Sequence, residues 1–215
     1  MKLLETALAT LSKNGAIFCS EADFQHALGW EIHLLDPTAK VNLEYPVSMS
    51  KGPNGIKSSV THIDGLVRTR DESEYFAFEL KYKTATFLAR NHGFYFELRH
   101  QGAADFAWYD FWKDVKRLEF LKNHSYFTEG YALMLTNDRY IWSGPRNNHT
   151  SGVQFSLNSI RKGPGILKWG KTINKSTLGG RHKSIELSRE YKIEWHDFCS
   201  FNDKNGQFRY LLVKV

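Results

Sequence analysis

Three charged residues in the stretch 61–84 have the types and spacing of a small reaction centre: Asp64, Glu79 and Lys81. Two runs rich in apolar residues, joined by the polar segment 70–74, predict a β-hairpin. Side chains alternate between the two faces of a strand, so Glu79 and Lys81 should lie together on the face opposite an aromatic stripe. Asp64 lies on the partner strand beside Gly65, where a strand can bend and turn its carboxylate.

These residue types suit metal-assisted hydrolysis of a phosphodiester. Two carboxylates can hold a hard divalent cation such as Mg²⁺ and leave positions for water and phosphate. The cation polarises the phosphoryl group and helps to form hydroxide, and a lysine can position or deprotonate the water and neutralise developing charge. The alternative is that Glu79 and Lys81 form a solvated ion pair and that Asp64 is a turn residue. An unbroken aromatic strand with the small Ala77 beside Glu79 favours the reaction centre.

The sequence resembles the motif of the PD-(D/E)XK nuclease superfamily. In that motif an apolar residue precedes an aspartate, here Asp64; after a turn, another apolar residue precedes a glutamate, any one residue and a lysine, here Glu79 and Lys81. Asp64 matches its first acid, Glu79 its second acid and Lys81 its lysine, while Ile63 stands where the motif has a proline. The resemblance covers roughly residues 15–140. It implies a restriction-endonuclease-like fold, Mg²⁺ or Mn²⁺ held by Asp64 and Glu79, and DNA more often than RNA as the substrate.

Two helices beside the hairpin are each expected to bring one more polar residue near the site. Ser20 predicts an N-cap with Glu21 in the first turn of a helix, where a carboxylate also suits the helix dipole. The range 101–123 predicts an amphipathic helix with Gln101 near its start. The resemblance implies that Glu21 reaches the metal and that Gln101 lies close to it. The alternatives are a dipole partner for Glu21 and a residue that only opens the helix for Gln101.

The order of elements around the hairpin predicts an α/β (α+β) fold with an αβββαβ core, a mixed central sheet and flanking helices. A helix is expected over 2–12, ahead of that core. The range 40–50 alternates and contains Pro46, which predicts an edge strand followed by a turn at 51–55. The range 130–137 is apolar throughout and predicts a fully buried strand.

The range 139–185, here called the basic segment, contains no Asp or Glu and carries nine Lys and Arg residues. A basic stretch on a mildly acidic body predicts a polyanion binder, and the alternative is a solvated loop. Its seven glycines would let backbone approach phosphate, and its aromatic residues would either stack on bases or anchor the segment to the body. The candidate nucleic-acid contacts are Arg161, Lys162, Lys168, Lys171, Lys175, Arg181 and Lys183.

Composition is that of an ordinary globular protein of 215 residues, with 41% hydrophobic and 24% charged residues. We expect one domain over 1–215, in which the basic segment is an insertion and 186–215 adds a closing β-hairpin. No apolar run is long enough to cross a bilayer. The chain has two cysteines, Cys19 and Cys199, which do not form a disulfide framework. We expect both to be reduced, buried thiols of a cytoplasmic protein, and the alternative is a single disulfide bond between them.

The function expected from these observations is a metal-dependent nuclease, most simply a DNA endonuclease in repair, recombination or restriction-type defence. The alternative is a catalytically silent nuclease fold that binds nucleic acid, or a module whose basic segment binds an acidic protein partner. Superfamily members that cut both strands are often dimers, so a homodimer is an open expectation.

Overall fold

The computed structural model describes residues 2–49, 59–145, 151–171 and 175–215, and the turn expected at 51–55 lies outside these ranges. The chain begins with helix α1 (Leu3–Lys13) and helix α2 (Glu21–Leu35), followed by strands β1 (Lys40–Met49), β2 (Ser59–Arg68) and β3 (Tyr75–Lys83). A small hairpin, β4 (Phe87–Asn91) and β5 (Phe94–Leu98), leads into helix α3 (Ala104–Asn123) and strand β6 (Glu129–Thr136). The succession from α2 to β6, with the small hairpin added, follows the predicted order.

The rest of the chain consists of short elements and a long terminal hairpin. The basic segment contains helix α4 (Arg139–Ser143), 3-10 helix η1 (Val153–Phe155), strands β7 (Arg161–Lys162) and β8 (Gly165–Leu167), and 3-10 helix η2 (Lys175–Leu178). Strands β9 (Ile185–Leu187), β10 (Tyr191–Lys192), β11 (Trp195–Ser200) and β12 (Gln207–Lys214) follow. The predicted closing hairpin is therefore present as β11 and β12, although β10 pairs with β7 instead of extending it.

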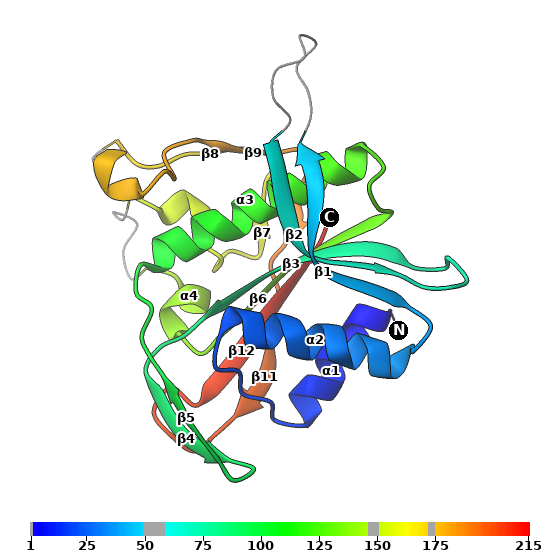
Figure 1. Ribbon diagram of the computed structural model, residues 1–215. Coiled ribbons are helices and arrows are strands. Elements are labelled where there is room, and N and C mark those ends of the chain that lie inside the picture. The colour runs from blue at the N-terminus through cyan, green and yellow to red at the C-terminus, as the bar shows by residue number, and fades with distance from the viewer. Residues whose placement is uncertain (1, 50–58, 146–150, 172–174) are drawn as a thin grey trace.

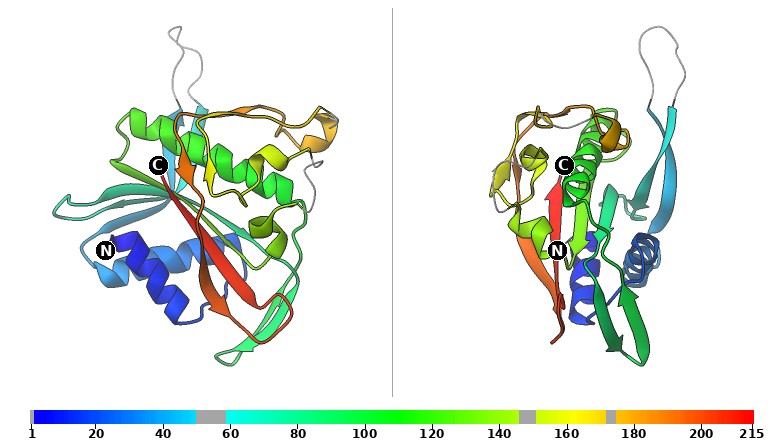
Figure 2. Two further views of the ribbon diagram at one scale, coloured as in Figure 1. Left: turned by 180° about the vertical axis from the view of Figure 1, so that it is seen from behind. Right: turned by 90° about the vertical axis from the view of Figure 1, so that its left-hand side faces the viewer.

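Six strands form one mixed sheet in the order β1-β2-β3-β6-β12-β11 (Figure 1). Strands β3 and β6 are parallel, joined through α3, and the other neighbours in the sheet are antiparallel. Strand β1, which contains Pro46, lies at one edge as predicted, and β6 is buried between β3 and β12. Helices α1 and α2 lie on one face of the sheet, and α3 with the basic segment lies on the other (Figure 2).

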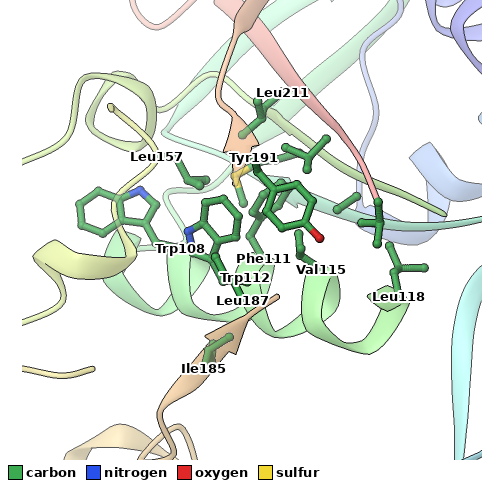
Figure 3. Packing of buried hydrophobic residues seen from close by; sticks show 14 of the residues in the cluster. Trp108, Phe111, Trp112, Val115, Leu118, Leu157, Ile185, Leu187, Tyr191 and Leu211 are labelled. Carbon is green, nitrogen blue, oxygen red and sulfur yellow. The ribbon is translucent and has the colours of Figure 1, made fainter. Parts of the chain in front are cut away.

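Strand β3 separates two hydrophobic cores, because its side chains alternate between the two faces. Its aromatic stripe enters the core under α1 and α2, whereas Ala77 enters the core under α3. The α3 core is rich in large side chains, among them Trp108, Trp112 and Tyr191 (Figure 3). The indole N–H of Trp112 donates to the backbone oxygen of Phe155 at 2.8 Å, so α3 also fixes the basic segment in place.

Candidate functional site

The site begins where β2 and β3 separate. Their pairing ends at Gly65 opposite Phe78, and beyond it the Asp64 carboxylate accepts the backbone N–H of Leu80 at 2.6 Å through Oδ2. A Cβ at Gly65 would lie 2.1 Å from the ring of Phe78, so no side chain fits there. Gly65 therefore allows an aromatic ring to pack closely under the strand, and Asp64 then points into the fork between the two strands.

Glu79 is held by a guanidinium from helix α3. Arg117 donates from Nε to Oε1 of Glu79 at 2.5 Å, and its Nη2 lies 2.5 Å from Oε2. Nη2 also donates to Oδ1 of Asp114 at 2.8 Å. Oε2 of Glu79 is buried and has no hydrogen bond from the described residues, so its contact with Nη2 is an ion pair. The alternative of a solvated pair between Glu79 and Lys81 is thus wrong: Glu79 is 1% exposed and its partner is Arg117.

Lys81 lies beside Glu79 and faces three carboxylates. Its Nζ is 2.8 Å from Oδ2 of Asp114 and 3.9 Å from Oε1 of Glu21, and it donates to the backbone oxygen of Leu80 at 2.9 Å. Burial alone would lower the pKa of Lys81, but the carboxylates of Asp114, Glu21 and Asp64 outweigh it and raise that pKa above its ordinary value. Lys81 is therefore an ammonium at neutral pH.

The first turns of α2 complete the site from the opposite face of the sheet. The predicted N-cap is confirmed, since Ser20 accepts the backbone N–H of Asp23 at 3.1 Å. This places Glu21 where its Oε2 accepts the backbone N–H of Tyr82 at 2.9 Å. Glu21 is thus both a residue of the first helical turn and a neighbour of Lys81.

Gln25, one turn further along α2, links two strands of the site. Its Nε2 donates to the backbone oxygen of Asp64 and to Oε1 of Glu44, both at 2.7 Å. Glu44 has a positive φ of 50°, and the register of β1 against β2 skips this residue. A left-handed conformation is uncommon for glutamate. The distortion turns an exposed carboxylate of the edge strand back toward Gln25.

We call Glu21, Asp64, Glu79, Lys81, Asp114 and Arg117 the charged cluster. Its four carboxylates exceed its two cations by two formal charges. Burial raises the pKa of Asp64 to about 6, against the opposing effect of Lys81. Burial, followed by the charge of Asp114, raises the pKa of Glu79 well above its ordinary value. Both shifts have the sign expected for carboxylates that share a poorly solvated site.

The donor atoms of the charged cluster fit a hard divalent cation in type and in charge. Carboxylate oxygens are the ligands that Mg²⁺ prefers, and Oε2 of Glu79 and Oδ2 of Asp114 are buried without a hydrogen bond from the described residues. In the arrangement present, however, no three His, Cys, Asp or Glu side chains in the described ranges lie close enough to hold an ion together. Arg117 in addition contacts both oxygens of Glu79.

The structure brings together Asp64, Glu79, Lys81 and Glu21, but it does not bring Gln101 to them. Helix α3 begins at Ala104, and Gln101 is exposed before it, with its backbone N–H donating to Thr84 at 2.9 Å. Sequence reasoning also missed the two residues that α3 contributes, Asp114 and Arg117. Their signal was the polar stripe they form beside the apolar face of α3, at a spacing of three residues.

The aromatic residues of the basic segment anchor it to the body. Phe155 is fully buried. Trp169 stacks on Tyr109 of α3, with ring centroids 5.6 Å apart, and its indole N–H donates to the backbone oxygen of Arg181 at 2.5 Å. Tyr140 stacks on Trp108 and remains 39% exposed. Anchoring is therefore the interpretation that the structure supports for Phe155 and Trp169.

The predicted nucleic-acid contacts divide into paired and unpaired cations. Arg181 makes a bidentate pair with Asp110, at 2.9 Å from Nε to Oδ1 and 2.7 Å from Nη2 to Oδ2, and Arg161 pairs with Glu190 at 2.5 Å. Lys162 is half-buried, and burial lowers its pKa. The side chain of Lys175 lies outside the described part of the chain. Of the predicted nucleic-acid contacts, the three exposed lysines Lys168, Lys171 and Lys183 have no ion pair among the described residues.

A cavity of about 660 Å³ lies between α3 and the basic segment. Lys113 and Lys116 of α3 line it together with Lys183, and Lys113 is exposed without an ion pair in the described ranges. These α3 lysines immediately precede Asp114 and Arg117, so the cavity and the charged cluster occupy neighbouring faces of one helix. Asp110 and Glu186 also line the cavity, so its lining is mixed in charge with an excess of cations.

Both cysteines are free thiols. Cys199 is half-buried, but Cys19 is exposed, so the expectation of buried thiols is wrong for Cys19. Its place just before the N-cap of α2 explains the exposure.

Comparison of the chain with protein-family models, with curated proteins and with solved structures finds no match in any of the three. Within the described ranges, no helix combines the length and the apolar character needed to span a bilayer.

Proposed function

We propose that this chain is a metal-dependent nuclease that hydrolyses phosphodiester bonds of nucleic acid, with DNA as the expected substrate. The observation that carries the proposal is the convergence of Asp64, Glu79, Lys81 and Glu21 at the fork between β2 and β3. Asp64 points into that fork and Glu21 lies 3.9 Å from Lys81. The strand order supports the proposal as well: three antiparallel strands, then a helix and a parallel strand, match the succession that the nuclease resemblance implies.

The roles of the residues follow from their surroundings. When bound by Asp64 and Glu79, Mg²⁺ or Mn²⁺ would supply Lewis-acid polarisation of the scissile phosphate. Lys81 is kept protonated by Asp114, so its role is to orient the attacking water and to neutralise charge on the phosphate, and it is not the base that removes a proton. Gln25 holds the backbone of Asp64 and thereby fixes the direction of its carboxylate.

The basic surface gives the substrate a place to bind. Lys168, Lys171 and Lys183 of the basic segment are exposed, and Lys113 adds a cation from α3. Contacts of this kind release counterions from nucleic acid and bind it without sequence preference. Lys113 precedes Asp114 on α3, so this surface and the charged cluster share one helix.

A cleavage assay tests the proposal. Purified protein is mixed with supercoiled plasmid, linear duplex, single-stranded DNA and RNA, in Mg²⁺, Mn²⁺ or chelator. The parent should cut at least one substrate only with metal, and Lys81→Ala should cut about 10²- to 10³-fold more slowly. Lys83→Ala is the matched control, because Lys83 follows on the same strand and face but lies outside the charged cluster. Equal rates for both lysine variants would remove Lys81 from the reaction.

One observation favours a second candidate, a silent nuclease fold that binds nucleic acid or an acidic protein. Glu79 is engaged by Arg117 on both oxygens, and no three ligand side chains in the described ranges converge. Under this alternative the parent would bind duplex in a salt-dependent manner and would cut no substrate with either metal. Failure to bind any nucleic acid would instead favour the acidic protein partner.

A further inference from the structure

Helix α3 places a cation on the carboxylate that the proposed function assigns to the metal. Arg117 contacts both oxygens of Glu79, at 2.5 Å each, and the Glu79 side chain is fully buried. Arg117 is itself only 19% exposed. The contact is therefore a nearly dry ion pair at the centre of the site and not a loose surface pair that water would exchange freely.

Arg117 does not balance the charge of the site. Arg117 and Lys81 together carry two positive charges, whereas the four carboxylates of the charged cluster carry four negative formal charges. The difference of two equals the charge of one divalent cation. Like charges in a poorly solvated site repel one another strongly. The charged cluster therefore carries an excess of negative charge that a divalent cation would neutralise.

Two buried oxygen atoms in the site also lack a hydrogen bond from the described residues, Oε2 of Glu79 and Oδ2 of Asp114. Each is in an ion pair with a cation that is shared with another acceptor: Arg117 Nη2 lies 2.5 Å from Oε2 of Glu79 and also donates to Asp114, and Lys81 Nζ lies 2.8 Å from Oδ2 of Asp114 and also donates to the backbone oxygen of Leu80. A buried oxygen in this state is costly unless something binds it. Both atoms belong to carboxylates, so a divalent cation could replace the shared cation at either oxygen.

We infer that Arg117 is the resident counter-cation of this site: it occupies Glu79 when no metal is bound and gives way when a divalent cation binds there. This inference rests on the proposed function, because it takes Glu79 as a metal ligand. Arg117 need not leave the site. It already donates to Asp114 at 2.8 Å, so it can rotate away from Glu79 while keeping that hydrogen bond. It is a positioning residue that sets how readily metal enters.

Metal binding, measured without any substrate, tests the inference. Metal-free full-length protein is titrated with Mn²⁺, and free Mn²⁺ is followed by its paramagnetic resonance signal. Arg117→Met should bind Mn²⁺ about 5- to 150-fold more tightly than the parent, the usual range for coupling between two binding events. Arg117→Lys, which keeps the charge, should stay close to the parent. Lys204→Met is the control, since it removes one exposed cation from the turn of the terminal hairpin and should leave the affinity unchanged.

A double-mutant cycle assigns the effect to Glu79. In the Glu79→Gln background, Arg117→Met should no longer tighten Mn²⁺ binding, because the carboxylate for which the two cations compete is gone. If Arg117→Met does not fold, Arg117→Gln keeps a hydrogen-bond donor without the charge and is expected to bind Mn²⁺ more tightly than the parent as well. A purely structural Arg117 would give the opposite sign, since loosening the site would weaken metal binding.

Mn²⁺ affinity in the folded Arg117→Met or Arg117→Gln variant that equals that of the parent, or is weaker, overturns the inference. If the parent still cuts nucleic acid in Mn²⁺, the proposed function stands and only the role of Arg117 is lost. Absence of Mn²⁺ binding by the parent and by every variant overturns the inference and the metal-dependent function together.

Discussion

Glu79→Gln is the obvious test of a nuclease, and the structure predicts that it changes stability as well as chemistry. The substitution removes the negative partner from a buried ion pair and leaves the Arg117 guanidinium facing a neutral amide. Breaking a buried pair typically costs about 3–5 kcal/mol. The lower end applies here, about 3 kcal/mol, because Arg117 keeps Asp114 at 2.8 Å and glutamine can still accept a hydrogen bond.

The assay is thermal unfolding followed by circular dichroism, in chelator so that metal does not contribute. For a domain of this size each kcal/mol shifts Tm by about 2–4 °C, so Glu79→Gln should unfold about 6–12 °C below the parent. The double variant Glu79→Gln, Arg117→Met removes both charges and should recover most of that loss, because a neutral pair leaves no uncompensated charge. Neither variant should cut nucleic acid.

This comparison separates the structural role of Glu79 from its chemical role. Recovered stability without recovered cleavage would show that the carboxylate itself is required for the reaction. A Glu79→Gln protein with the parent's Tm would refute the buried ion pair. A double variant no more stable than the single one would refute the assignment of the loss to Arg117.

Three further predictions follow from other parts of the molecule. A variant with alanine at Lys168, Lys171 and Lys183 should bind duplex with a weaker dependence on salt. The slope of log K against log salt should decrease in magnitude by about 0.9 for each phosphate contact removed. The same change at Lys204, an exposed lysine in the turn of the terminal hairpin, should leave the slope unaltered. Gly65→Ala should destabilise the fold by about 1–3 kcal/mol through overpacking, and adding Phe78→Leu should relieve part of the loss; equal stability of Gly65→Ala and the parent would contradict the 2.1 Å approach. Cys19 should react with a thiol reagent at pH 8 in the folded protein, whereas Cys199, whose thiol pKa is raised to about 12 by burial, should react only after unfolding. Equal labelling rates for the two cysteines would contradict this difference.

Local rules were sufficient to predict part of the site. Alternation along β3 puts Glu79 and Lys81 on one face whatever the rest of the chain does. The N-cap at Ser20 likewise fixes Glu21 in the first turn of α2, through the hydrogen bond from Asp23. Both inferences need only a few neighbouring residues, and both agree with the structure.

The partners of these residues depend on tertiary packing and were not predicted. Arg117 lies 38 positions from Glu79, and only the rotation of α3 on the sheet decides that its guanidinium faces inward. Lys116, the residue before it, lies on the neighbouring face of α3 and lines the cavity. The basic segment is similar in this respect, because indole N–H groups hold it to the body through isolated backbone oxygens that have no sequence period.

Helix α3 contacts both the basic segment and the charged cluster and so connects the two. Asp110, Asp114 and Arg117 are spaced four and three residues apart, so they form one stripe along the helix. At one end of this stripe Asp110 holds Arg181 of the basic segment, and one turn later Asp114 holds Lys81 while Arg117 holds Glu79. Under the proposed function, a nucleic acid bound at Arg181 would act on the same helix that positions the lysine and the carboxylate. Among the predicted basic contacts, Arg181 thus differs from Lys168 and Lys171, because its pair with Asp110 ties the basic segment to the helix that carries Asp114 and Arg117.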